Sequence, residues 1–196
     1  MSDNRVGTKL RQLREDRQWT VDDLADQSEV SSGMIQQIEA GDLIPSLTPL
    51  LRIARGMGVR LGTFLDDDAH QGPVVVRAGQ GRAMARFSGG SEHVHTPDGT
   101  LKFVSVAPDK KDRHMEPFLI DVQPSNSEQS ETHLSSHEGE EFIYVLEGSL
   151  EVAYGKTTER LEAGDSIYYD SVVPHHVRAV GDQPAKILAV VYAPLV

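Results

Sequence analysis

Two histidines and one glutamate are spaced so that they could hold a metal ion. His137 opens the string H-E-G-E-E-F-I-Y-V-L-E-G, and Glu141 stands four residues later. His175 follows a turn at residues 163–165 and lies in the string P-H-H. Two imidazoles and one carboxylate form the ligand set of non-haem iron sites, and manganese, nickel or zinc can also accept it. We therefore predict a divalent metal (Fe, Mn, Ni or Zn) bound by His137, Glu141 and His175.

Short β-strands must bring these three side chains together, because no helical pattern of useful length follows residue 70. The candidate strands are separated by turn-forming residues, a pattern typical of an all-β sandwich or barrel. Neighbouring strand residues point to opposite faces, so we expect His175 to point inward and His176 outward. We predict strands at 73–77, 82–87, 101–107, 117–123, 141–146, 149–154, 157–161, 166–169, 176–179 and 185–193.

The two motifs resemble those of the cupin family, small antiparallel jelly-roll β-barrels that hold a metal or a small ligand at the mouth. Cupins supply their ligands as H-x-H, then a carboxylate, then a histidine of the second motif. Ser135 stands where the first of these histidines would fall, and His133 lies two residues out of register. The resemblance therefore implies a site with two histidines and one carboxylate. We expect Ser135, Tyr144 and Tyr168 to line an effector pocket beside it.

A pocket without a metal is the alternative for this half of the chain. The acidic side chains would then only shape the mouth of a pocket for an organic effector. Lys110, Lys111 and Arg113 lie in a nearby loop and would suit an anionic effector, whereas the acidic mouth would suit an amine. The sequence leaves both ligand classes open.

The N-terminal half is predicted to form five short helices within residues 5–65. Apolar residues recur there at helical spacing, and Thr20 followed by Asp23 is typical of an N-cap with an acidic first turn. Gly41 is well placed for a left-handed helix end. The two helices that residues 27–31 connect have the spacing of a helix-turn-helix motif.

The string T-V-D-D-L-A-D-Q-S-E-V-S-S-G-M-I-Q-Q-I-E-A-G resembles the lambda-repressor-like (Xre) family of DNA-binding domains. In such domains the second helix of the motif enters the major groove of double-stranded DNA, and its N-terminal half contacts the bases. Gln side chains can pair with adenine, and Ser side chains accept several bases. By this resemblance the DNA-binding residues are Thr20, Ser31, Ser32, Gly33, Gln36, Gln37, Arg52 and Arg55, with Thr20 and the two arginines contacting phosphates.

The charge of the chain argues against non-specific binding to nucleic acid. The net charge is −11, and residues 1–67 contain eight basic and eleven acidic side chains, a net of −3. Bulk attraction to phosphate requires clustered Lys and Arg. A helical domain that binds another protein, or a helix-turn-helix that has lost its DNA contacts, is therefore the alternative for this half.

The lack of cysteine and of long apolar segments excludes several classes of protein. The chain contains no cysteine, which excludes disulfides, thiolate metal sites and a cysteine nucleophile. Its N-terminus is polar, and no apolar run approaches the ~18–20 residues needed to span a bilayer. We therefore expect a cytoplasmic protein.

Both resemblances together predict a two-domain protein, α then β. We place a helix-turn-helix DNA-binding domain at residues 1–66, a linker at 67–73 and a cupin sensor domain at 74–196. This arrangement implies a sequence-specific transcriptional regulator whose cupin domain binds a small-molecule effector, a metal or both, and thereby changes its affinity for DNA. Two-fold DNA sites would require a homodimer or a larger even-numbered homo-oligomer.

An enzyme is the main alternative to a regulator. A mononuclear non-haem iron enzyme of the epoxidase or oxygenase type can carry the same two domains and the same ligand set. In such an epoxidase a lysine of the helical domain assists at the iron, and Gln18 stands in its place here. A protein that senses the metal itself, without an organic effector, is the third possibility.

Overall fold

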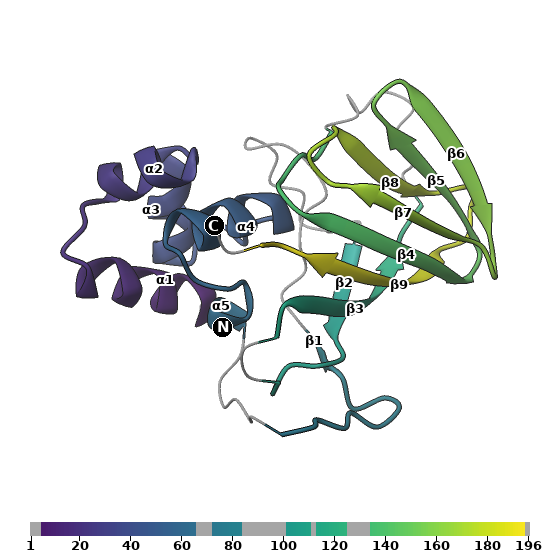
Figure 1. Ribbon diagram of the computed structural model, residues 1–196, viewed down its shortest axis with the longest axis horizontal. Helices are drawn as coiled ribbons and strands as arrows, with labels where there is room; N and C mark the ends of the chain where they lie inside the picture. Colours follow the sequence, from purple (N-terminus) through teal and green to yellow (C-terminus); the bar gives the residue numbers. More distant parts are fainter. Residues whose placement is uncertain (1–4, 66–71, 84–100, 111–112, 125–133, 195–196) are drawn as a thin grey trace.

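The protein divides into a helical part and a strand part, which lie on opposite sides of the molecule (Figure 1). The structure, a computed structural model, describes residues 5–65, 72–83, 101–110, 113–124 and 134–194. Within these residues, no helix has the length and apolar character that a membrane span requires.

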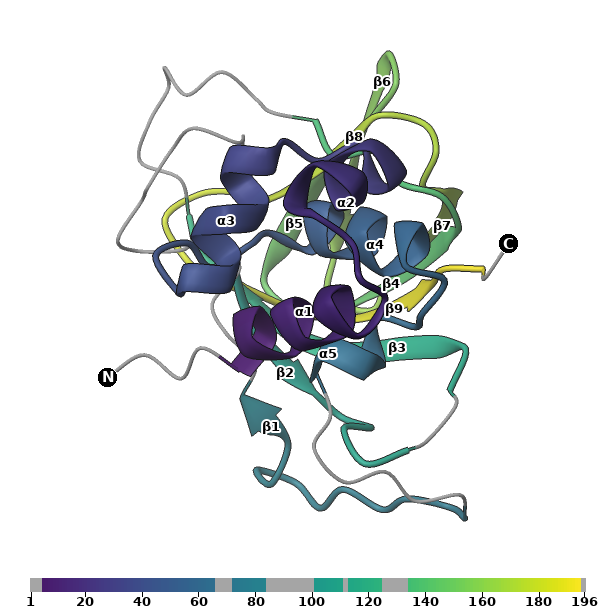
Figure 2. The ribbon, with the colours of Figure 1, turned by 90° about the vertical axis from the view of Figure 1, so that its left-hand side faces the viewer.

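Five helices form the N-terminal part, which confirms the prediction made for it. They are α1 (Arg5–Asp16), α2 (Val21–Ser28), α3 (Ser32–Ala40), α4 (Leu47–Gly56) and α5 (Gly62–Leu65). Each contributes fully or nearly fully buried apolar side chains to the core, among them Leu10, Leu24, Ile35, Leu50 and Phe64. Helix α4 lies between the α2–α3 pair and the strands (Figures 1 and 2).

Local capping sets the ends of α2 and α3. The Thr20 hydroxyl accepts a hydrogen bond from the backbone N–H of Asp23 at 3.0 Å, and the Asp23 carboxylate accepts one from the backbone of Thr20 at 2.7 Å. Ser31 caps α3 by accepting from the N–H of Met34. Gly41 ends α3 with a φ of 82°, a left-handed conformation that costs glycine little. These caps fix the start of α2 and both ends of α3.

Nine strands form two antiparallel sheets in the rest of the described chain. They are β1 (Arg82–Ala83), β2 (Leu101–Ser105), β3 (Met115–Val122), β4 (Glu140–Glu147), β5 (Ser149–Tyr154), β6 (Thr157–Glu162), β7 (Ser166–Asp170), β8 (His175–Ala179) and β9 (Ala185–Tyr192). One sheet has the order β1-β2-β3-β9-β4-β7 and the other β6-β5-β8. Buried side chains of both sheets, such as Phe118, Ile143, Leu150 and Ile187, form the core between them. This is the antiparallel cupin architecture expected from the sequence.

The predicted strand at 73–77 is wrong. Residues 73–77 form no strand, and Val75 is 69% exposed. Their β-branched side chains favour extended backbone, but a strand also needs a partner for its hydrogen bonds. The strand predicted at 82–87 begins as expected, and its remaining residues, from 84 on, lie outside the described part.

Some expectations fall on residues that the structure does not describe. His133, Lys111 and most of the predicted linker are among them. The domain limits at 66, 73 and 74 therefore stay predictions, although the last helix ends at Leu65 and the first strand begins at Arg82.

Candidate functional site

The fold brings the three predicted metal ligands into one buried cluster. His137 precedes β4, Glu141 lies within β4, and His175 begins β8 in the other sheet. One ligand atom of each lies within 4.8 Å of the other two. The Nε2 of His137 is 2.7 Å from Oε1 of Glu141, and the Nε2 of His175 is 3.5 Å from the same oxygen. Residues from both sheets thus meet at a single carboxylate.

Backbone contacts hold the segment around His137 in place. The N–H of His137 donates to the carbonyl of Ser171 at 3.0 Å. Ser135 pairs with His175 through two backbone hydrogen bonds, of 2.7 and 2.9 Å. Gly139 then turns the chain into β4 with a φ of 108°, and a Cβ there would overlap the carbonyl oxygen of Tyr192. The glycine of the H-E-G-E-E string is therefore required by the close approach of β9.

A hydrogen bond from Nδ1 orients each of the two imidazoles. The Nδ1–H of His137 donates to the carbonyl of Glu138 at 3.1 Å, and the Nδ1–H of His175 donates to the carbonyl of Val173 at 3.0 Å. A carbonyl oxygen can only accept, so Nδ1 carries the proton in both rings. Metal-binding histidines in proteins are held in this way, with Nε2 left to the metal.

Tyr169 completes the cluster. Its hydroxyl donates to Oε2 of Glu141 at 2.7 Å, and its ring centroid is 5.0 Å from that of His175. Tyr169 stands opposite Glu141 in the pairing of β4 with β7, so both side chains face the core. Sequence reasoning missed this position, because Tyr168 and Tyr169 are adjacent and the local pattern does not say which of them faces the core.

Tyr144 and Tyr168 face away from the metal cluster, and their place in an effector pocket stays a prediction. They lie on the outer face of the six-stranded sheet and are 38% and 63% exposed. Strand alternation is the reason: Glu141, Ile143 and Val145 point inward, which turns Tyr144 outward. Ser135 remains next to His175 through its backbone pairing, and its role in an effector pocket stays a prediction.

The cluster fixes the protonation of its members. Burial raises the pKa of Glu141, but the hydrogen bonds and charges of His137 and His175 outweigh it, so the pKa lies well below its usual range. Burial lowers the pKa of His175, and the hydrogen bond and charge of Glu141 more than offset this, so the pKa is raised. Burial and then the charge of Glu141 raise the pKa of Tyr169. At neutral pH Glu141 is therefore a carboxylate and Tyr169 a hydrogen-bond donor.

The donor set fits a divalent transition metal. Nε2 of His137 and Nε2 of His175 lie 2.7 and 3.5 Å from Oε1 of Glu141. Lone pairs on these three atoms repel one another unless a cation lies between them. Protons can remove this repulsion. A metal ion that accepts two nitrogens and one carboxylate oxygen can also remove it, and Fe, Mn, Ni and Zn are such metals. A metal held in this way by three protein ligands keeps coordination positions open for another molecule.

A second group of predicted residues lies on α3 and its flanks. Gln36 and Gln37 are exposed, as are Ser31 and Gly33. The Ser32 hydroxyl donates to Asp22 at 2.6 Å, which ties the start of α3 to α2. Thr20 is exposed at the N-cap of α2. The residues expected to contact DNA bases thus lie at the N-cap of α3 and along its solvent side, as far as Gln37.

A nearly buried ion pair joins the inner side of α3 to α1. Glu39, on its buried side, accepts from Arg14 of α1 at 2.7 and 2.8 Å and from Arg11 at 3.3 Å. The hydrogen bond and charge of Glu39 raise the pKa of Arg14, although burial acts in the opposite direction. No local sequence pattern indicates this pair, because Arg14 and Glu39 lie 25 residues apart.

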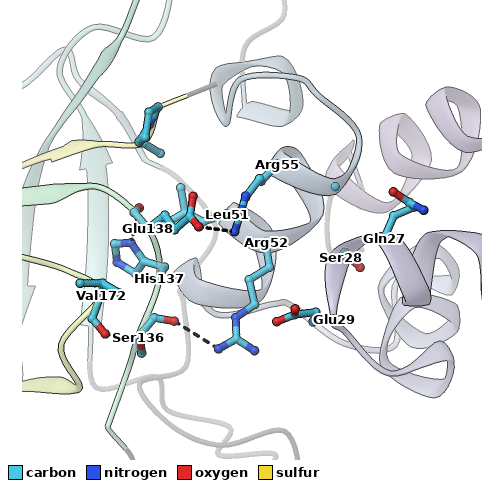
Figure 3. Close-up of a pocket in the computed structure, with 13 residues that line it drawn as sticks. Gln27, Ser28, Glu29, Leu51, Arg52, Arg55, Ser136, His137, Glu138 and Val172 are labelled. Carbon is cyan, nitrogen blue, oxygen red and sulfur yellow. Dashed lines mark hydrogen bonds and ion pairs between the residues drawn. The ribbon is translucent and has the colours of Figure 1, made fainter. Parts of the chain in front are cut away.

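Arg52 and Arg55 of α4 point toward the strand domain. Nη2 of Arg52 donates to the carbonyl of Ser136 at 3.2 Å, and Nη1 of Arg55 lies 2.7 Å from Oε1 of Glu138 (Figure 3). These two partners flank His137 on either side. The phosphate contacts expected for Arg52 and Arg55 stay a prediction, since in this structure both arginines bind the other domain.

Family comparisons agree with the two halves of the fold. A model of the helix-turn-helix domain matches residues 5–63, and a model of the cupin domain matches residues 118–191. Among curated relatives, the HTH-type transcriptional regulator SutR of Escherichia coli (strain K12) is 25% identical over 189 residues, covering 96% of this chain and 95% of the relative. The (S)-2-hydroxypropylphosphonic acid epoxidase of Streptomyces wedmorensis is 28% identical over 160 residues, covering 78% and 76%.

A solved structure of the same fold spans almost the whole chain. The crystal structure of an HTH_3 family transcriptional regulator from Vibrio cholerae superposes with a TM-score of 0.68 at 23% identity, covering 97% of this chain and 96% of that one. At this identity the likeness shows the fold alone. Together with the two family models, this fold shows a helix-turn-helix domain over residues 5–63 and a cupin domain over residues 118–191.

Proposed function

We propose that this protein is a sequence-specific DNA-binding transcriptional regulator whose cupin domain binds a divalent metal, and with it a small effector, to change affinity for DNA. The observation that carries the proposal is the solvent face of α3, where Ser31, Gly33, Gln36 and Gln37 stand exposed. The regulator of E. coli that matches 96% of this chain supports it.

Selection of bound duplexes from a random DNA library tests the first half of the proposal. We expect an enriched sequence that the full chain binds in a salt-sensitive way, because phosphate contacts release counterions. Gln37→Ala should weaken binding to this sequence by about 1–3 kcal/mol, the value of a bidentate base contact. Gln80→Ala, outside the helical domain, is the matched control. The absence of any enriched sequence would contradict DNA binding.

Metal analysis of the purified chain tests the second half. We expect about one transition metal ion per chain, since the three protein ligands match sites of that class. His175→Ala should lose the metal, whereas His176→Ala, on the neighbouring position of β8, should keep it. Equal metal content in both variants would remove His175 from the site.

A homodimer is part of the proposal, and the outer face of the large sheet supports it. Tyr168, Phe142, Val190 and Pro117 form one apolar row across four strands. A second row lies beside it and contains Tyr144, Leu188, Leu119 and Val104. A contiguous apolar face of this kind favours association, and a pair of chains would present two recognition helices to a two-fold DNA site.

An iron-dependent epoxidase or oxygenase is the second candidate. The cluster of His137, Glu141 and His175 has the composition of a non-haem iron site, and an epoxidase is among the curated relatives. Gln18 argues against the same reaction, because it replaces the lysine expected in such an epoxidase. Oxygen consumption by the iron-loaded protein with hydroxyalkylphosphonates would favour the enzyme, and DNA binding without oxygen consumption would favour the regulator.

A further inference from the structure

A cleft of about 410 Å³ lies between the two domains (Figure 3). Its helical side comes from the end of α2 and from α4, and its other side from the segment before β4, from Val172 and from the end of β9. His137 lines the cleft, and its imidazole contacts Glu141 inside the strand domain. The cleft therefore borders the metal cluster at this one residue, whereas Glu141 and His175 do not line it.

The cleft carries four charged side chains with a net charge of zero. Arg55 and Glu138 neutralise each other at 2.7 Å. Arg52 reaches only the carbonyl of Ser136 within the described residues, and no carboxylate of that part pairs with it. Glu29, at the end of α2, likewise has no basic partner there. Among the residues that the structure describes, Arg52 and Glu29 thus form no ion pair, and their charged groups face each other across the cleft (Figure 3).

We propose that this cleft binds a small zwitterion of the amino-acid type, with Arg52 holding its carboxylate and Glu29 its ammonium group. A guanidinium has five N–H donors, and Arg52 uses one of them on Ser136. The remaining donors can bind a carboxylate in the bidentate manner that arginine favours.

Charge selects the ligand class. A simple anion would meet the unpaired Glu29, and a simple cation would meet the unpaired Arg52, so a molecule with both charges is the complementary one. The volume is at the lower end of the range for small-molecule sites, and such sites often lie between domains. A molecule bound there would contact α2, α4 and the segment that contains Ser136.

This site goes beyond the proposed function, and its test needs neither DNA nor metal. The isotope-labelled full chain is titrated, with a chelator present, against L-alanine, propionate and propylamine, three probes of similar size. L-Alanine should shift the Nε–H resonance of Arg52 with a dissociation constant on the order of 1 mM, as expected for a ligand of so few atoms. The two singly charged probes should bind at least about ten times more weakly, because each leaves one charge unpaired.

Calorimetry of matched variants then locates the binding. Arg52→Gln and Glu29→Gln should each weaken L-alanine binding at least about tenfold, since each removes one charge-assisted contact. Arg160→Gln and Glu159→Gln, exposed on β6, should leave it unchanged. Equal binding of the three probes, no binding of L-alanine at about 10 mM, or wild-type affinity in Arg52→Gln would overturn the proposal. The probe comparison uses the wild-type chain, so it decides even where a variant fails to fold.

Discussion

Oε1 and Oε2 of Glu141 have different partners. Oε1 faces the two Nε2 atoms, whereas Oε2 accepts the hydroxyl of Tyr169. The tyrosine therefore determines the rotation of the carboxylate and hence where Oε1 points. A residue that orients a metal ligand, as Tyr169 orients Glu141, supports metal affinity without contacting the metal itself.

Tyr169→Phe should lower metal affinity about 10- to 100-fold, the usual cost of losing a partner that orients a ligand. The ring stays, so its packing against His175 is preserved and the protein should still fold. Competition with a chromophoric chelator measures the affinity. Tyr144→Phe, on the outer face, is the control and should leave affinity unchanged; a similar loss in both variants would contradict the role given to Tyr169.

The three metal ligands could be chosen from sequence because their spacing in a motif carries the information. The tyrosines could not, because Tyr168 and Tyr169 are adjacent and only strand pairing decides which one faces the core. The pairing of β7 with β4 places Tyr169 opposite the buried Glu141. That register depends on residues 28 positions apart, beyond the reach of a local pattern.

At the scale of the elements, a single carboxylate, that of Glu39, joins α3 to two arginines of α1. Glu39→Gln should destabilise the helical domain by about 1.5–3 kcal/mol, the range for a hydrogen bond to a charged group, because the Glu39 side chain is only 4% exposed. Glu15→Gln is the matched control, since Glu15 is exposed and lies 3.8 Å from the same arginine. Its effect should stay within about 1 kcal/mol.

Thermal and urea denaturation of the two variants measure this difference. Because Gln keeps the shape of Glu, the comparison isolates the charge. If Glu15→Gln costs as much as Glu39→Gln, the ion pair beneath α3 does not stabilise the helix.

Gly139 and Gly164 form a second matched pair. Both have a positive φ, 108° and 98°, but only at Gly139 would a Cβ overlap another backbone atom. Gly164→Ala should cost about 1–3 kcal/mol from backbone strain alone. Gly139→Ala should cost more and should also lower metal content, since the segment joins His137 to Glu141. Equal effects in denaturation and metal analysis would exclude the close approach of β9 as the cause.

The predicted strand limits are correct where a turn-forming residue flanks the segment at each end. Ser149–Tyr154 lies between Gly148 and Gly155, and its predicted limits are those of β5. The failure at 73–77 has the opposite cause, because composition favoured a strand there but nothing in the sequence identified a partner. Propensity describes the backbone of one segment, whereas a strand requires two.

At the scale of the whole molecule, the proposed homodimer would form through the apolar outer face of the six-stranded sheet. Tyr144→Lys should convert the proposed dimer to a monomer, because burying an unpaired charge in an apolar interface is costly. Val75→Lys, which alters an exposed apolar side chain outside the sheet, is the control. Sedimentation velocity of both variants and of the wild type measures the mass. A wild-type monomer, or a Tyr144→Lys dimer, would contradict this interface.

Contacts between the domains are the part that sequence reasoning missed. Arg52 and Arg55 matched positions expected to contact phosphate, yet they bind residues 136 and 138. Domain placement depends on pairs more than 80 residues apart, which no local motif records. These two contacts join α4 to the segment on either side of His137.

Strand β9 occupies an inner position of the six-stranded sheet, between β3 and β4. Strand β9 is the last of the nine strands to be synthesised, and a ribosome adds about 5–20 residues per second. Until residues 185–192 emerge, β3 and β4 have no partner between them and their apolar edges stay open. The helical domain, complete by residue 65, can fold many seconds earlier, so the nascent chain passes through a stage with a finished helix-turn-helix and an unfinished barrel.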